Sequence, residues 1–312
     1  CYYIESILGD PSEEAKVVFE EDGGVKIIVG TQSNGQGHET VYAQFLSDQT
    51  GIPTEKIIVV QGDSDLIPRG GGTGGSRSVT VQNNATLATV EKIIQSFSQY
   101  LSEKLEVDVE DIGFDDTSFR IKGSNYSPNA LEVAKMACED HRFDLLKHSA
   151  KATLDARSFP NGAHFAEVEV DPETGFVQVV KYCVVDDFGN LINPMLAEGQ
   201  VHGGVAQGIG QALYENVVYD QEGQLLTATF MDYGMPRAQD LPYYKFETEC
   251  VPSTANIMGM KGCGEAGTVG ALAAVANAVQ DALWGFGIQQ VDMPFTSEKI
   301  WSMINSDKSA EE

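Results

Sequence analysis

Long apolar runs are missing from this sequence of 312 residues, and no stretch of 18 apolar residues occurs in it. A helix needs about 20 such residues to span a bilayer, so we expect no membrane-spanning segment. Basic residues are also scarce, because 20 Lys and Arg stand against 46 Asp and Glu and leave a formal net charge of −26. This charge repels nucleic-acid backbones and anionic membrane surfaces, and we expect neither as a partner.

Clustered cysteines are absent as well. The five cysteines, Cys1, Cys138, Cys183, Cys250 and Cys263, are dispersed, with no CxxC pair and no cysteine–histidine spacing typical of zinc. An odd number of dispersed thiols in a chain of this size favours a reducing, cytoplasmic compartment. The sequence opens at Cys1 without a methionine or a signal peptide, as expected of a processed product, a truncated piece or the ordered part of a longer chain.

Glycine, by contrast, is abundant in a chain of ordinary hydrophobic content. There are 32 glycines, and hydrophobic residues make up 42% of the sequence, so a folded core is expected. A length of 312 residues favours two domains. A change in composition near Ala150 suggests a first subdomain of residues 1–150 and a second of residues 151–312.

The hydrophobic periodicity alternates between the two periods typical of strands and helices. Predicted strands cover residues 16–20, 25–29, 56–61, 162–170, 176–185 and 225–229, and residues 108–122 are predicted to be strand and turn. Predicted helices cover residues 40–48, 80–105, 128–138, 194–215, 266–283 and 298–304, and we expect residues 306–312 to be frayed. Regular βαβ spacing is missing, so the pattern predicts an α+β fold with two subdomains of mixed or antiparallel sheets packed with helices.

Three glycine-bearing polar segments lie immediately before predicted helices. They cover residues 35–40, 70–78 and 261–267, and Arg77 is a rare cation among them. Backbone N–H groups at a helix N-terminus bind anions without needing a positive side chain, which suits a strongly acidic protein. The alternative is that these segments are loops whose glycines only provide a positive φ.

Familiar nucleotide and hydrolase motifs fail in these segments. The run from Gly35 has Thr40 where the dinucleotide fingerprint needs a third glycine, and no GxxxxGK[ST] occurs. His38 and Glu39 begin like a zinc protease motif, but Tyr42 replaces the second histidine. Ser76 is not in a nucleophile elbow, because the motif there ends in serine instead of glycine.

Two side chains are chemically suggestive. The predicted helix around Gln200 holds several glycines, each of which costs about 1 kcal/mol relative to alanine. Either tight helix–helix packing, or a cofactor that contacts the backbone where glycine leaves no side chain, would offset this cost. Glu265 lies among glycines at the start of an apolar helix, where it is either an acid that complements the helix dipole or a general base in a tight pocket.

Taken together, these segments resemble the molybdenum hydroxylases, the family of xanthine dehydrogenase, aldehyde oxidoreductase and aerobic carbon monoxide dehydrogenase. The similar stretches, in the family's order, are Gly35-Gln-Gly-His-Glu-Thr40, Gly74-Gly-Ser-Arg-Ser78, Val185-Asp-Asp-Phe-Gly-Asn-Leu-Ile-Asn-Pro194, Glu198-Gly-Gln-Val-His-Gly-Gly204 with Ala206-Gln-Gly-Ile-Gly210, and residues 260–270. Leu272 and Ala273 replace a Pro-Pro pair frequent in the family, and Cys263 stands where valine is more common.

The resemblance implies a cofactor and roles for individual residues. Glu265 would be the catalytic base, and Gln200 would lie beside the metal centre. The cofactor would be molybdopterin cytosine dinucleotide, whose dithiolene holds a molybdenum that carries a terminal sulfido or selenido ligand. Its implied contacts are Gln36, Gly37, His38, Glu39, Thr40, Gly75, Ser76, Arg77, Ser78, Gln200, Lys261, Cys263 and Gly264.

The resemblance also implies partners. The chain is similar to the C-terminal, molybdopterin-binding half of the large subunit, and a large subunit split in this way occurs in nicotinate dehydrogenase, as its medium molybdopterin subunit. The N-terminal half, an iron–sulfur subunit and an FAD subunit would be separate chains. The expected activity is hydroxylation, with water, of a carbon in an N-heteroaromatic small molecule such as nicotinate or a purine. The alternatives are oxidation of an aldehyde or carbon monoxide, or a cofactor-binding half without catalysis.

Overall fold

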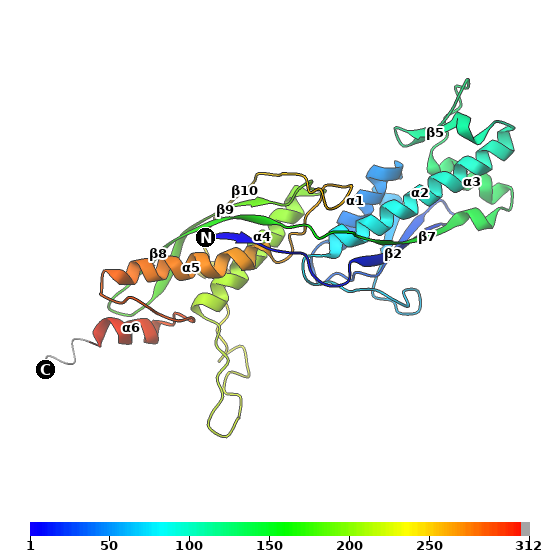
Figure 1. The fold of residues 1–312 in the computed structure, drawn as a ribbon. Coiled ribbons are helices and arrows are strands. Elements are labelled where there is room, and N and C mark those ends of the chain that lie inside the picture. Colours follow the sequence, from blue (N-terminus) through cyan, green and yellow to red (C-terminus); the bar gives the residue numbers. More distant parts are fainter. Residues whose placement is uncertain (307–312) are drawn as a thin grey trace.

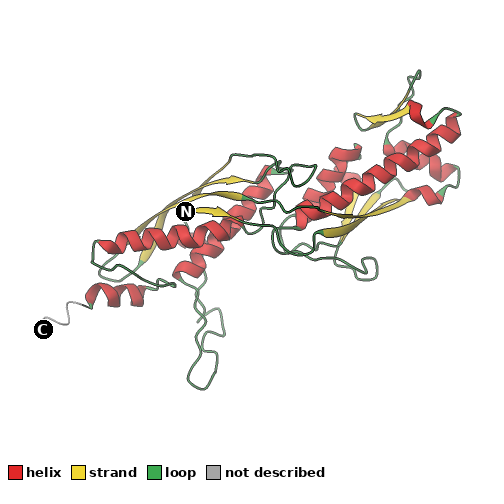
Figure 2. Ribbon diagram, in the orientation of Figure 1, coloured by secondary structure: helices red, strands yellow, loops and turns green. Residues whose placement is uncertain are grey.

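Two four-stranded sheets organise the chain, and each has helices packed against it to form a lobe (Figure 1). The computed structural model describes residues 1–306, and the expectation of a frayed end falls, for residues 307–312, outside the described part. The lobes follow one another along the long axis of the molecule, and both combine helices with strands (Figure 2). The predicted α+β fold with mixed sheets is confirmed.

The first lobe is built on a sheet with the strand order β4-β3-β2-β7. The strands are β2 (Ser12–Phe19), β3 (Val25–Val29), β4 (Ile57–Val60) and β7 (Lys147–Thr153). Its helices are α1 (His38–Thr50), α2 (Ser78–Leu105) and α3 (Ala130–Glu139), and a small hairpin joins β5 (Ile112–Asp115) to β6 (Ser118–Ile121). Short 3₁₀ helices occupy Thr54–Lys56, Val109–Asp111 and Phe143–Leu146.

The alternation of buried side chains along β2 and the helical spacing of apolar residues along α2 explain the hydrophobic core of this lobe. Along β2 every second side chain is buried, as expected for a strand with one covered face. On α2, Val90, Ile93 and Phe97 lie on one face and pack against Val17 and Ile27 of the sheet in one hydrophobic cluster.

The second lobe has a sheet with the order β1-β8-β9-β10. Its strands are β1 (Tyr2–Ile4), β8 (Asn161–Val170), β9 (Val177–Asp187) and β10 (Tyr244–Thr248). Its helices are α4 (Pro194–Leu213), α5 (Ala266–Trp284) and α6 (Ser297–Asn305), with a 3₁₀ helix at Ala238–Asp240. The two antiparallel long strands and the two long helices bury a second cluster that includes Tyr182, Val201 and Val275.

The N-terminal strand ties the lobes together. β1 pairs with β8, so the first residues belong to the second sheet before the chain crosses to β2. Along the crossing, the Leu8 N–H donates to the Gly75 carbonyl oxygen, in the loop that leads into α2. Residue 150, the proposed subdomain boundary, lies within β7, and β7 pairs with β2 in the first sheet.

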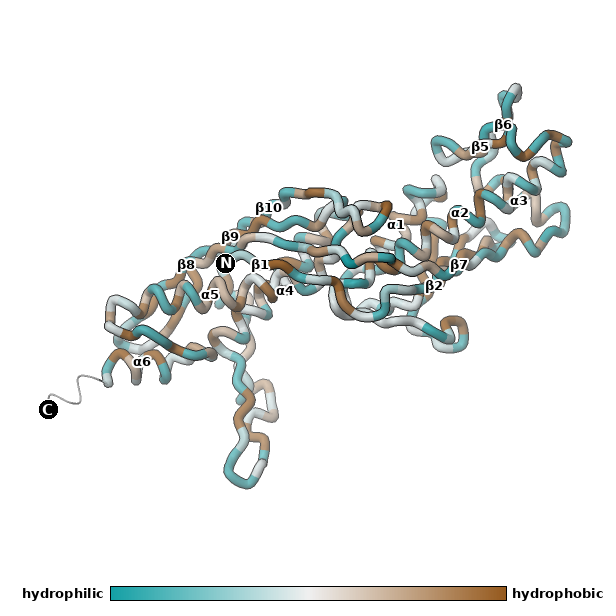
Figure 3. The backbone as a smooth tube through the Cα atoms, in the orientation of Figure 1, coloured by the Kyte–Doolittle hydropathy of each residue, from teal (hydrophilic) through white to brown (hydrophobic). Residues whose placement is uncertain are grey.

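One predicted strand is wrong, and three strands were not predicted. Residues 225–229 lie in an exposed arm between α4 and β10, and only a single bridge between Tyr219 and Leu225 forms there. This segment of leucine, threonine and alanine residues has no neighbouring strand to pair with, so its strand propensity has no effect. The arm extends away from the second lobe and alternates apolar and polar stretches (Figure 1, Figure 3). The unpredicted strands are β1, β7 and β10.

Candidate active site

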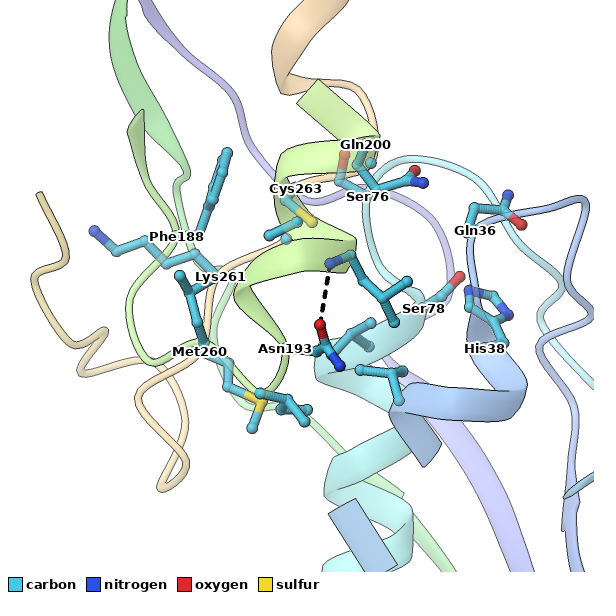
Figure 4. Close-up of a pocket in the computed structure, with 18 of the residues that line it drawn as sticks. Gln36, His38, Ser76, Ser78, Phe188, Asn193, Gln200, Met260, Lys261 and Cys263 are labelled. Carbon is cyan, nitrogen blue, oxygen red and sulfur yellow. Dashed lines mark hydrogen bonds between the residues drawn. The ribbon is translucent and has the colours of Figure 1, made fainter. Parts of the chain in front are cut away.

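A cavity of about 300 Å³ lies where the two lobes meet. Its walls come from the loop before α1, the loop before α2, the segment that leads into α4, and the loop before α5. Figure 4 shows these side chains around the cavity, with Gln36 and His38 on one side and Phe188, Met260 and Lys261 on the other. The predicted site residues that line it are Gln36, His38, Ser76, Ser78, Gln200, Lys261, Cys263, Gly264 and Glu265.

Of the helices that begin at this cavity, three lack a side-chain cap. These are α1, α2 and α5, the helices that follow the three glycine-bearing segments. By contrast α3, α4 and α6 are capped by the side chains of Asn129, Asn193 and Thr296. The first-turn N–H groups of an uncapped helix need acceptors from elsewhere, and the positive end of the dipole favours an anion. The described part of the chain therefore directs three uncapped helix ends, each with the positive end of its dipole, at one cavity.

Close packing of α4 on α5 brings Gln200 and Glu265 to the same cavity. A Cβ at Gly204 would lie 2.9 Å from the Gly267 Cα, and one at Gly208 would lie 2.5 Å from the Ala271 Cβ. The glycines on this face are therefore explained by helix–helix packing, one of the two predicted alternatives. Gly199 and Gly203, on either side of Gln200, have no described atom within 4 Å of such a Cβ.

Ser76 joins the two lobes at the cavity. Its hydroxyl oxygen accepts a hydrogen bond from the Glu265 backbone N–H over 3.0 Å, and the hydroxyl donates to Glu265 Oε2 over 3.4 Å. Ser76 has a φ of 53°, in the left-handed region that costs a side-chain-bearing residue about 1 kcal/mol or more. A strained serine whose hydroxyl orients a carboxylate is typical of a functional site, and the Glu265 side chain itself remains exposed.

His38 presents a neutral imidazole at the start of α1. The ring Nδ1 lies 3.2 Å from the Thr31 carbonyl oxygen, and only a protonated Nδ1 can donate to that oxygen. Burial lowers the pKa of His38, although this contact and Glu39 oppose the shift. The Nε2 atom is then left as an acceptor, and His38 provides no positive charge at neutral pH.

Lys261 and Cys263 contribute no free charge to the cavity either. The Lys261 ammonium lies 2.5 Å from Asp187 Oδ2, and both side chains are largely buried, so the lysine lines the cavity with its charge already paired. Burial raises the pKa of the Cys263 thiol to about 12, with further contributions from Glu5 and Asp186, so the thiol stays protonated. Both residues lie in the loop that precedes Glu265.

Arg77 does not face the cavity. Its guanidinium pairs with Glu13 at 2.9 Å, and both side chains are only 2% exposed. The same group donates to the carbonyl oxygens of Asp10, Gly72 and Ser12. Its hydrogen bonds go to the loop of residues 70–75, to Asp10 just before β2, and to β2 itself. Any effect of Arg77 on a bound anion would therefore act through the shape of this loop.

Four other predicted residues lie outside the cavity wall. Gly37 has a φ of 78° and is the last residue before α1, against Leu196. Glu39 and Thr40 are exposed on α1, and Glu39 accepts a hydrogen bond from Gln61. Gly75 has a φ of 61°, and a Cβ there would meet Leu8 at 2.9 Å. These four residues lie in or next to the loops before α1 and α2, but the cavity itself is lined by the residues beside them.

Some cavity residues were not singled out from the sequence. Phe188 and Met260 form an apolar wall, and Asn193 caps α4 while its amide donates to Gln44 of α1 over 3.1 Å. Phe188 and Asn193 lie in the stretch Val185–Pro194, whose motif was noted without roles for its members. Glu5 is a further neighbour of Ser76 that no motif indicates.

No group of three or more His, Cys, Asp or Glu side chains within residues 1–306 is placed to hold a metal ion. None of the described helices is both long enough and apolar enough to cross a membrane.

Comparison with known proteins identifies the family of the chain. Residues 1–242 match the molybdopterin cofactor-binding domain family. The chain is 34% identical over 305 residues to the 6-hydroxypseudooxynicotine dehydrogenase complex subunit gamma of Paenarthrobacter nicotinovorans, covering 96% of this chain and 38% of that one. It is 38% identical over 298 residues to the nicotine 6-hydroxylase large subunit of the same organism, covering 92% of this chain and 36% of the relative.

Solved structures agree with these matches. The fold superposes on CO dehydrogenase from Oligotropha carboxidovorans with a TM-score of 0.90 and 30% identity, covering all of this chain and 40% of the other. The chain therefore spans well under half the length of the relatives it matches.

Proposed function

Since the chain belongs to the molybdopterin cofactor-binding family of the molybdenum hydroxylases, we propose that it supplies the half of an active site that holds the catalytic base. The assembled enzyme would use water to hydroxylate a carbon of an N-heteroaromatic compound. One observation carries this proposal: Glu265, in the residue before α5, and Gln200, in α4, line the same cavity.

The donors at the cavity fit a polyanionic pterin cofactor. Three uncapped helix N-termini and neutral side chains face the cavity, while Lys261 is already paired with Asp187. Gln36, His38 and Ser78 would hold the cofactor through hydrogen bonds, which avoids any need for cations in so acidic a chain. We propose the cytosine dinucleotide form, with the metal held by the pterin dithiolene and bearing a sulfido or selenido ligand. When bound, the metal centre supplies Lewis-acid activation of water and accepts two electrons.

The chain's own residues have defined tasks in this scheme. Glu265 would accept one proton from water at one of its carboxylate oxygens, and Ser76 keeps the residue oriented through its hydrogen bonds to the Glu265 backbone N–H and to Oε2. The Gln200 side chain would present its NH₂ group as a donor and its carbonyl oxygen as an acceptor to the metal centre. Phe188 and Met260, each buried, exclude water from the apolar side of the cavity.

The remaining parts would come from other chains. The chain covers 36–38% of these relatives, so we propose that the N-terminal half of the large subunit closes the cavity and shapes the substrate pocket. An iron–sulfur subunit and an FAD subunit would carry the electrons away. The division of the large subunit resembles that of nicotinate dehydrogenase. The five free cysteines favour assembly in a reducing compartment such as the cytoplasm.

The names of the relatives favour a pyridine-type substrate, because two of them are called nicotine 6-hydroxylase and 6-hydroxypseudooxynicotine dehydrogenase. A second candidate is oxidation of carbon monoxide or an aldehyde, favoured by the TM-score of 0.90 to CO dehydrogenase. Assays of the purified complex with nicotinate, a purine, an aldehyde and carbon monoxide separate these possibilities.

The decisive test is Glu265→Gln in the assembled complex. The amide cannot take up a proton, so kcat should fall by about 100-fold or more while molybdenum and pterin contents stay at wild-type levels. Glu14→Gln, an exposed acid on β2, is the matched control and should leave both unchanged. A full rate with Glu265→Gln, or a native complex without molybdenum and pterin, would contradict the proposal. In that case the chain would be a cofactor-binding half without catalysis, or would have a different function.

A further inference from the structure

Glu5 carries a buried carboxyl group directly beside the proposed base. It follows β1, whose pairing with β8 fixes its backbone, and its N–H donates to the Pro160 carbonyl oxygen over 2.9 Å. Both of its carboxyl oxygens are shielded from solvent, and neither has a hydrogen-bond partner among the described residues. An ionised carboxylate in such a position is costly, because it has lost water and gained no donor.

The groups that face Glu5 do little to stabilise its ionised carboxylate. Burial raises the pKa of Glu5; the Ser76 hydroxyl opposes this shift, and the negative charge of Glu265 adds to it. Two further neighbours, Tyr3 and Cys263, are neutral groups whose pKa values are themselves raised by burial and by Glu5. The nearby Arg77 guanidinium is already paired with Glu13.

Ser76 lies between the two carboxyl groups and has only one proton to give. Its oxygen accepts from the Glu265 N–H, and its hydroxyl donates to Glu265 Oε2. A hydroxyl oxygen can accept two hydrogen bonds while it donates one, so one acceptor position of Ser76 remains. A neutral carboxylic acid at Glu5 is the donor that would complete it.

We propose that Glu5 is a positioning residue that remains protonated in the working enzyme and donates a hydrogen bond to the Ser76 oxygen. The Ser76 hydroxyl then donates to Glu265 and not to Glu5. This inference rests on the proposed function, in which Glu265 is the base. A protonated Glu5 removes a second negative charge from the site and keeps Glu265 anionic and fixed. An ionised Glu5 would compete for the Ser76 proton and repel Glu265.

The proposal predicts a pH dependence with a definite sign. Burial without a hydrogen-bond donor disfavours the ionised carboxyl group and raises the pKa of Glu5, so the group keeps its proton to a higher pH than an ordinary glutamate and loses it as the pH increases further. The rate should therefore decline on the alkaline side as Glu5 ionises. The residues that face it across the site, Ser76 and Glu265, are the ones that this ionisation would disturb.

The test compares Glu5→Gln and Glu5→Ala in the assembled complex, with Glu14→Gln as the control. The Gln amide can still donate to Ser76 but cannot ionise, so Glu5→Gln should keep kcat within about threefold of the wild type and lose the alkaline decline. Glu5→Ala should lower kcat about tenfold, as expected when one hydrogen bond at a charged group is lost. The proposal is overturned if Glu5→Gln is as slow as Glu5→Ala, or if it retains the alkaline decline of the wild type.

Infrared spectroscopy of the same complexes provides a readout that does not need turnover. The wild type and Glu14→Gln should show, at neutral pH, a carbonyl stretch of a protonated carboxylic acid that is missing in Glu5→Gln. Absence of this band in an active complex defeats the inference on Glu5 and leaves the proposed function intact. If Glu265→Gln retains the full rate, the proposed function fails instead, and the band still reports whether Glu5 is protonated.

Discussion

The backbone N–H of Glu265 donates a hydrogen bond to the hydroxyl of Ser76, 189 positions earlier in the chain, over 3.0 Å. Glu265 precedes α5 in the second lobe, and Ser76 belongs to the loop that leads into α2 in the first. A Cβ at Gly262 would collide with the Ser76 carbonyl oxygen, so the two loops can touch only because that position is glycine. The orientation of the proposed base is thus determined by contact between the lobes.

Replacing Ser76 tests whether this contact sets the rate. Ser76→Gly and Ser76→Ala both lose the hydroxyl, and we expect both to lower kcat by about tenfold. Their stabilities should differ, because glycine adopts the φ of 53° freely, whereas alanine is strained there by about 1 kcal/mol. Steady-state kinetics and thermal unfolding of the complex measure the two effects separately. A full rate with Ser76→Gly would show that the hydroxyl does not position the base.

Arg77→Ala should destabilise the first lobe. The variant leaves Glu13 buried without its partner, a change that typically costs about 3–5 kcal/mol. Loss of the loop's shape should also reduce cofactor content. Glu13→Gln is the matched comparison, because Glu13 lies behind the loop and its Oε1 accepts from the Gly71 N–H. If Arg77 acts through the loop, both variants lose cofactor and stability together, as measured by pterin content and unfolding midpoint. Cofactor loss in Arg77→Ala alone, at wild-type stability, would instead indicate a direct phosphate contact.

Much of the fold could be predicted from sequence patterns that extend over only a few residues. The glycine-bearing segments did predict where α1, α2 and α5 begin, because helix starts depend on residues within one turn. The two strands that pair as β2 and β3 were likewise predicted from local alternation at residues 16–20 and 25–29. β1 was not, because three residues have too little pattern, and their pairing with β8 is about 160 positions away in sequence.

The site shows the same division between local and long-range information. Gln200 and Glu265 were predicted from motifs, and the cavity contains both. The environment of Arg77 could not be predicted, because its partner Glu13 is 64 positions away and a motif does not say which way a side chain points. Glu5 was missed for a related reason: an isolated glutamate acquires its chemistry only from Ser76 and Glu265, which approach it through folding.

The crossing of α4 and α5 can be tested with two glycines of the same helix. Gly208→Ala should destabilise the lobe by about 1–3 kcal/mol, because the new methyl group would overlap Ala271. It should also lower kcat, since α5 carries Glu265 at its start. Gly203→Ala is the control for stability: no described atom lies within 4 Å of its Cβ, and the helix should gain about 1 kcal/mol. Unfolding midpoints of the two variants should therefore move in opposite directions, and a shared direction would contradict this packing.

The Asp187–Lys261 pair should make the stability of the cavity wall depend on pH. Burial alone would raise the pKa of Asp187, but Lys261 and the N–H groups of Val251 and Gly189 outweigh it, so the pKa is lowered. A carboxyl group with a lowered folded-state pKa stabilises the protein fully above its unfolded value, about 3.9, and this contribution is lost as the pH falls through the folded value. Asp187→Asn should therefore cost about 1–3 kcal/mol at pH 7, and the difference from the wild type should shrink below about pH 4. Denaturant unfolding at a series of pH values measures this, and a difference that stays constant with pH would show that the charge of Asp187 is not what stabilises the wall.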